Sequence, residues 1–147
     1  MSRRAIGAIS ISVIACIICG ALGFARYVDW PSFDGSQHVR EYLPSQYAVQ
    51  DAHFYRYRNF MDSWDLYRFT TSPEAIEFLA ARLHLSRQGV VYEFPLIVSR
   101  PPPYWWHPEL LREADLYRNS ERAPDGHVYE LLYSQETGVA YLIQFDG

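Results

Sequence analysis

The chain has 147 residues, 49% of them hydrophobic and 16% aromatic, which predicts one packed domain with a short appendage and excludes general disorder. All 13 basic residues are arginine, and after Arg26 ten arginines stand against 17 acidic residues, a net charge of −7. This balance argues against nucleic acid as a partner and against polybasic attachment to anionic lipid.

The N-terminal residues predict a membrane-spanning segment. The 20 uncharged residues 5–24 would extend about 30 Å as a helix, the thickness of a bilayer's hydrocarbon core. Arg3 and Arg4 precede this run and Trp30 follows it, so the positive-inside rule places the N-terminus in the cytoplasm. We therefore expect a transmembrane signal-anchor over residues 1–26 in a bacterial inner membrane, with the remainder extracytoplasmic.

Two other processing routes were weighed for this segment. A cleaved secretory signal has a shorter apolar region and a small-x-small cleavage site, which this run lacks. Residues Val13 to Cys16 resemble a bacterial lipobox, in which Cys16 would carry the lipid. The residues after Cys16 stay apolar where a mature lipoprotein turns polar. Lipidation at Cys16 is the alternative to the anchor.

Small residues recur along one side of the expected membrane helix, at Ala8, Ser12, Cys16 and Gly20. Such a stripe allows a second helix to approach closely and predicts a possible homodimer face. Small residues are also common in membrane helices without any such role. Both cysteines of the chain lie in this segment, so the external part has none for a disulfide or a nucleophile.

Residues 27–46 contain Pro31, Gly35 and Pro44, and this pattern predicts a tether with one helical turn after Ser36. The extracytoplasmic domain is expected over residues 47–147. It begins with two aromatic-rich runs, 52–60 and 64–70, which predict a hairpin.

A helix is predicted next, with Ser72 as N-cap, Pro73 as its first residue and an apolar stripe that ends near residues 84–89. His84 in its last turn suits the negative end of the helix dipole. Residues 90–99 predict a strand, and Pro95 within it indicates an edge or a bulge.

The stretch 99–109, SRPPPYWWHPE, holds four of the nine prolines. Extended proline-rich backbone would present Tyr104, Trp105, Trp106 and His107 as a possible partner-binding strip, for a protein or a glycan. The rings could equally enter the membrane interface or complete the core. Because neighbouring side chains of an extended chain point in different directions, we expect one tryptophan buried and the other partly exposed.

Residues 108–118 predict a second, weaker helix, and residues 127–134 and 139–146 predict a hairpin around 135–138. The expected fold is therefore α+β: an N-terminal transmembrane helix plus a small antiparallel sheet with one main helix packed on it.

The sequence contains no catalytic, nucleotide-binding or metal-binding motif, so no enzyme activity, cofactor or metal site is predicted. The two carboxylates of Asp62 and Asp65 are interpreted as turn-forming residues. A glycosidase pair drawing on one of them is the less favoured alternative.

Four segments resemble features of small bacterial envelope proteins that carry an N-terminal anchor or lipid: residues 43–50, 55–70, 101–108 and 133–146. The resemblance implies an envelope location and no particular activity. The predicted function is a single-pass, membrane-anchored binding or adaptor domain for an envelope protein or glycan. A membrane-anchored immunity or inhibitor protein is the competing class, and an extracytoplasmic hydrolase comes third.

Overall fold

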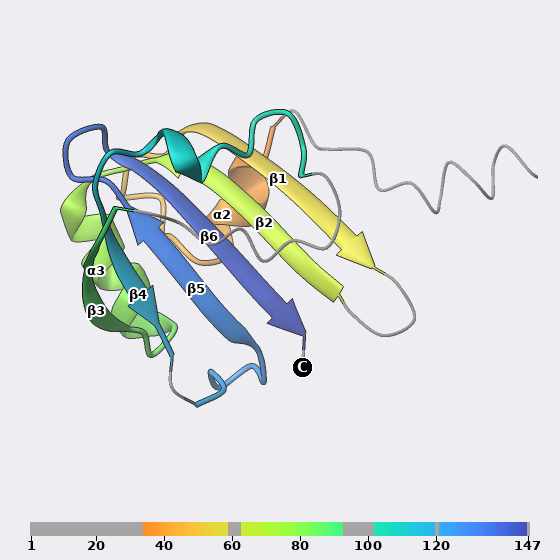
Figure 1. The fold of residues 1–147 in the computed structure, drawn as a ribbon. Coiled ribbons are helices and arrows are strands. Elements are labelled where there is room, and N and C mark those ends of the chain that lie inside the picture. Colours follow the sequence, from red (N-terminus) through yellow and green to blue (C-terminus); the bar gives the residue numbers. More distant parts are fainter. Residues whose placement is uncertain (1–33, 59–62, 93–101, 120, 147) are drawn as a thin grey trace, which may run out of the picture. The chain divides into compact units, whose positions relative to one another are not determined.

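The computed structural model describes residues 34–58, 63–92, 102–119 and 121–146, all within one compact unit. They form an α+β fold with one antiparallel sheet (Figure 1). The helical elements are α2 (Ser36–Arg40), α3 (Pro73–Arg82) and the 3-10 turn η1 (Pro108–Leu110). The strands are β1 (Gln50–Arg58), β2 (Ser63–Thr70), β3 (Ser86–Val91), β4 (Ala114–Arg118), β5 (Val128–Tyr133) and β6 (Val139–Asp146).

The six strands are ordered β1-β2-β6-β5-β4-β3, and every neighbouring pair is antiparallel. Both predicted hairpins, β1–β2 and β5–β6, are confirmed. The last strand of the chain, β6, lies between β2 and β5 and joins the first hairpin to the rest of the sheet. Strands β2 and β6, which lie in the first and last parts of the described sequence, are therefore direct neighbours.

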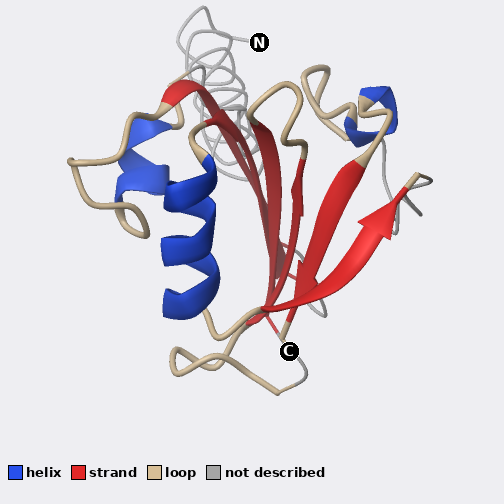
Figure 2. Cartoon of the chain, turned by 90° about the vertical axis from the view of Figure 1, so that its left-hand side faces the viewer, coloured by secondary structure: helices blue, strands red, loops and turns tan. Residues whose placement is uncertain are grey.

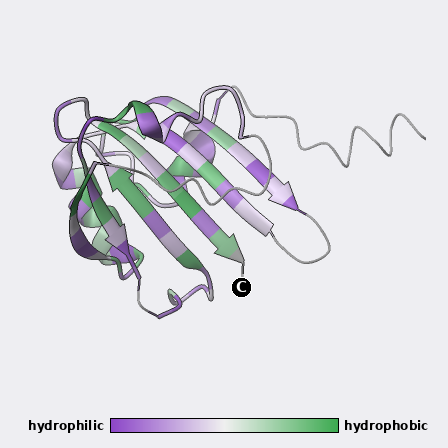
Figure 3. Cartoon of the chain, viewed as in Figure 1, coloured by the Kyte–Doolittle hydropathy of each residue, from purple (hydrophilic) through white to green (hydrophobic). Residues whose placement is uncertain are grey.

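The two faces of the sheet are covered differently. Figure 2 shows α3 and α2 on one side, here called the helix face, and η1 on the other, here called the link face. Each face has its own core cluster, because side chains alternate along a strand. Figure 3 shows hydrophobic and hydrophilic residues alternating along the strands. The buried residues of α3 are Ala75, Ile76, Leu79 and Ala80, all apolar.

The predicted helix is confirmed as α3, and its ends follow the sequence signals. Ser72 Oγ accepts a hydrogen bond from the Ala75 N–H at 3.4 Å, and Pro73 is the first helical residue. At the other end His84 adopts φ 56°, and Leu85 N–H donates to Ala80 O at 2.8 Å. This is a Schellman ending in which a histidine occupies the left-handed position that glycine favours.

The helical turn predicted after Ser36 is confirmed as α2, but residues 34–46 pack against the sheet and do not form a tether. Val39 in α2 and Leu43 after it are buried in the helix-face core, and His38 stacks on Phe54 with ring centroids 3.8 Å apart. Gly35 N–H donates to Ala52 O at 2.8 Å, and a Cβ at Gly35 would lie 2.5 Å from the His53 backbone. The breakers therefore mark a tightly docked segment, since only glycine permits this backbone approach.

Two predictions between α3 and β5 also need correction. Strand β3 begins at Ser86, four residues earlier than predicted, and residues 93–99 of the predicted strand lie outside the described residues. The helix predicted over 108–118 is a single 3-10 turn followed by β4. Leu116 and Tyr117 face opposite sides of the sheet, and β4 gains hydrogen-bonded neighbours on both edges, which outweighs a weak helical pattern.

The predicted transmembrane segment, the small-residue stripe of Ala8, Ser12, Cys16 and Gly20, and the lipidation at Cys16 all lie outside the described residues. Within the part of the chain that is described, no helix has the length and apolar character to cross a membrane.

Candidate functional site

A row of polar side chains crosses four strands on the helix face, where a sheet covered by helices would ordinarily be apolar. Strand register pairs Arg56 with Asp65, Asp65 with Gln144, and Gln144 with Tyr129. Because paired residues on adjacent strands share a face, these four side chains form one line from β1 through β2 and β6 to β5. The next row on this face, Phe54, Tyr67, Leu142 and Leu131, is buried in the core cluster that also contains Ile76 and Leu79 of α3. The polar row therefore borders the helix-face core.

Above this row the structure has a pocket of about 450 Å³, here called the tyrosine pocket. Its volume falls in the range of small-molecule sites in proteins. Only Leu83 and Pro124 among its lining residues lack a polar side-chain group. The lining comprises Glu41, Tyr42, Arg56, Asp65, Tyr67, Arg82, Leu83, Pro124, Asp125, His127, Tyr129 and Gln144.

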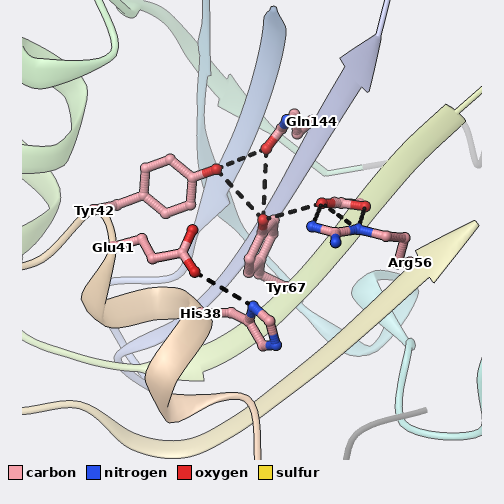
Figure 4. A network of polar contacts seen from close by, with 7 residues as sticks. His38, Glu41, Tyr42, Arg56, Tyr67 and Gln144 are labelled. Carbon is pink, nitrogen blue, oxygen red and sulfur yellow. Dashed lines mark hydrogen bonds and ion pairs between the residues drawn. The ribbon is translucent and has the colours of Figure 1, made fainter. Parts of the chain in front are cut away.

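Tyrosine hydroxyls form the centre of the pocket (Figure 4). Tyr42 donates to Gln144 Oε1 at 2.7 Å. The hydroxyl of Tyr67 lies 3.4 Å from Tyr42 Oη, 3.4 Å from Asp65 Oδ2 and 3.5 Å from Gln144 Oε1. Since the single Tyr42 proton goes to Gln144, Tyr67 is the donor within this group. The network fixes the positions of both phenols.

Asp65 is held by a bidentate ion pair with Arg56. Arg56 Nη2 lies 2.7 Å from Asp65 Oδ2, and Arg56 Nε lies 3.0 Å from Oδ1. Asp65 is 7% exposed, so the guanidinium supplies the charge and hydrogen bonds that water would otherwise provide. The ion pair thereby fixes the carboxylate in position, which suits a binding role.

The β4–β5 connection forms the far wall of the pocket. Tyr129 donates its hydroxyl proton to Asp125 Oδ2 at 2.7 Å, and Asp125 Oδ1 accepts from the His127 N–H at 3.1 Å. Asn119 Oδ1 accepts from the Tyr129 N–H at 2.8 Å. These bonds tie the loop to β5, so Asp125 faces the pocket from a fixed backbone.

Burial changes the acidity of the three phenols. The pKa of Tyr42, of Tyr67 and of Tyr129 is raised above the usual value, mainly because burial disfavours the phenolate. Asp65 adds to this for Tyr67, and the hydrogen bond to Asp125 adds to it for Tyr129. All three hydroxyls are therefore neutral throughout the physiological pH range.

A second pocket of about 310 Å³ lies beside β3 and β4. Its buried carboxylate, Asp115, accepts hydrogen bonds from Arg87 on one oxygen and from Gln135 at 2.8 Å on the other. Both oxygens of Asp115 are therefore occupied by the protein, and the site offers a ligand fewer groups than the tyrosine pocket.

The predicted partner-binding strip is not brought together on the surface. Trp105 is 7% and Trp106 1% exposed, so the expectation of one partly exposed ring is wrong. Trp106 contacts Tyr141 edge to face at 5.0 Å, and Trp105 stacks on His53 at 5.3 Å. Tyr104 is 65% exposed, and His107 Nδ1 pairs with Glu109 at 2.7 Å. The tryptophans close the core of the link face, and Tyr104 and His107 are the exposed members.

Sequence reasoning missed the tyrosine pocket. Asp65 was assigned to a turn, but it lies inside β2, and Asp62 lies outside the described residues. The available signal was the polar interruption of aromatic strands at Arg56, Asp65 and Gln144.

Within the described part of the chain no group of three or more His, Cys, Asp or Glu residues could hold a metal ion.

Comparison with models of known protein families, with curated proteins and with solved structures finds no match for this chain.

Proposed function

We propose that this chain is a single-pass, membrane-anchored binding or adaptor domain of the bacterial envelope, and that it binds through the tyrosine pocket. The observation that carries the proposal is the polar row of Arg56, Asp65, Gln144 and Tyr129 beneath a pocket of about 450 Å³. Apolar side chains at these strand positions would pack into the adjoining helix-face core, so four polar side chains there favour a binding role over a purely structural one. The apolar run at residues 5–24 supports the anchor.

Binding without catalysis fits the way two of the three carboxylates of the pocket are paired. Asp65 is paired with Arg56, and Asp125 accepts from Tyr129 and from the His127 backbone. Every oxygen of these two carboxylates already accepts a hydrogen bond from the protein, which favours a fixed binding role over proton transfer. The proposal therefore includes no chemical step.

In vivo photocrosslinking tests this function. A photoreactive residue at Pro124, on the exposed rim of the pocket, should capture envelope material from intact cells, identified by mass spectrometry. A periplasmic reporter fused after Gly147 should be active outside the cytoplasm. Capture of cytoplasmic components only, or a reporter active only inside the cell, would refute the proposal.

A further inference from the structure

The rings of the tyrosine pocket pack against each other and leave no cage for a cation. Tyr42 meets Tyr67 edge to face with centroids 5.7 Å apart, and it meets Tyr129 in the same way at 6.1 Å. These distances are those of touching rings. A ligand therefore contacts the hydroxyl ends of the tyrosines.

The hydroxyls offer acceptors, because their protons are already engaged. Tyr42 donates to Gln144, Tyr129 donates to Asp125, and Tyr67 donates within its network. Each neutral phenol oxygen keeps acceptor capacity after donating its one proton. The site thus requires a ligand with several donor groups.

Donors stand next to these acceptors. Gln144 accepts through Oε1, which leaves its amide nitrogen with two N–H donors, and Arg82 lies on the exposed rim. The ligand must therefore donate and accept within a short distance. A hydroxyl group does both, and a ring bearing several hydroxyls does so repeatedly.

The charges of the lining argue against an ionic ligand. Three carboxylates (Glu41, Asp65, Asp125) face two guanidiniums (Arg56, Arg82). The charge of Arg56 is already balanced by Asp65, which weakens attraction for phosphate. The charges of the lining nearly cancel, so neither a polyanion nor a polyamine is strongly attracted and a neutral ligand fits best.

We propose that the tyrosine pocket binds a neutral, polyhydroxylated sugar ring, presented by an envelope glycan. The inference rests on the proposed function, since it names the ligand class of the same site. Tyr42, Tyr67 and Gln144 contact the ring hydroxyls from the sheet, and Asp125 contacts them from the β4–β5 wall.

Saturation-transfer NMR on the full chain, in zwitterionic micelles without a sugar headgroup, tests this. The panel consists of glucose, N-acetylglucosamine, maltotriose and chitotriose, with spermidine and inorganic phosphate as ionic probes. We expect saturable transfer to the sugar ring protons. If the natural ligand is a polymer, the trisaccharides should bind more tightly than the monosaccharides. If it is a free sugar, monosaccharides and trisaccharides should bind equally well.

Matched Tyr→Phe variants locate the binding. Tyr42→Phe and Tyr129→Phe keep the ring contacts and remove one oxygen, and each should weaken sugar binding about tenfold. Tyr141→Phe is the same change on the link face and should leave binding unchanged. Thermal unfolding confirms that all three variants are folded.

Three results would overturn the sugar proposal: no sugar of the panel binds, phosphate or spermidine binds more tightly, or Tyr42→Phe binds sugar as the parent does. These results are separable from failure of the proposed function. If no sugar binds but the Pro124 crosslinker captures an envelope protein, the ligand class is wrong and the binding function stands.

Discussion

On the helix face, the hydroxyl groups of the buried tyrosines gather in the tyrosine pocket. On the link face, the buried tryptophans are enclosed by other aromatic rings. The hydroxyls of Tyr42, Tyr67 and Tyr129 all have partners. The indole N–H groups of Trp105 and Trp106 have no hydrogen-bond partner among the described residues. Large aromatic side chains thus build a polar pocket on one face and a closed core on the other, so aromatic content alone does not mark a binding site.

The largest effect on stability is expected for Trp106→Ala. Truncating a ring that is 1% exposed and packed on Tyr141 should lower the free energy of unfolding by about 3–5 kcal/mol, through lost burial and the cavity left behind. Chemical unfolding followed by far-UV circular dichroism measures it. The matched Tyr104→Ala change should cost less than about 0.5 kcal/mol. Equal small losses would show that the link face is not a core.

Gly35→Ala should disrupt the packing of α2 on the helix face. The new Cβ would lie 2.5 Å from the His53 backbone, so α2 must shift away from β1. We expect a loss of about 1–3 kcal/mol in unfolding free energy and weaker ligand binding, because Glu41 and Tyr42 follow α2. Ser36→Ala is the neighbouring control. An unchanged midpoint for Gly35→Ala would mean that the docking of residues 34–46 is wrong.

Alkaline pH should destabilise the helix face through its buried tyrosines. Burial, with Glu77 and Asp115 nearby, raises the pKa of Tyr117 to about 12. The unfolded chain loses this proton near pH 10, so the stability is complete below pH 10 and falls as pH rises through 12. For Tyr117 alone the loss is at most about 2–3 kcal/mol, because each pKa unit corresponds to about 1.4 kcal/mol. Unfolding midpoints from pH 8 to 12 should fall less steeply in Tyr117→Phe, and identical slopes would contradict this.

The smallest effect is expected outside both faces. His84 holds φ 56°, where a Cβ is unfavourable, and His84→Gly should raise the unfolding free energy by about 0.5–1 kcal/mol. The measurement is the same chemical unfolding. Sugar binding should not change in this variant. A loss of stability would indicate that the imidazole makes a stabilising interaction at the end of α3.

Local signals predicted local structure well. The capping residues Ser72 and Pro73 and the turn at Gly138 (φ 70°) determine α3 and the β5–β6 hairpin with few alternatives. Segments without strong local signals were misassigned. Residues 34–46 and 114–118 take their structure from the sheet against which they pack, and that sheet is a tertiary property.

The site escaped prediction for a related reason. Arg56, Asp65, Gln144 and Tyr129 lie on four strands, and only the register of a sheet in which β6 is central places them in one row. Taken singly in the sequence, each of these four residues is typical of an ordinary surface or turn position. The proline-rich stretch 99–109 showed the opposite error. Its composition predicted a binding strip, but Trp105 and Trp106 are buried in the core of the link face.

The most direct test of the central claim compares crosslinking from the two faces in the same cells. A photoreactive residue replaces Pro124 on the helix face in one strain and Tyr104 of the stretch 99–109 in another. The captured envelope material is then quantified. The account predicts capture from Pro124, abolished by competing sugar, and background levels from Tyr104. Capture from Tyr104 with none from Pro124 would contradict the account and would indicate that the partner binds at the stretch 99–109.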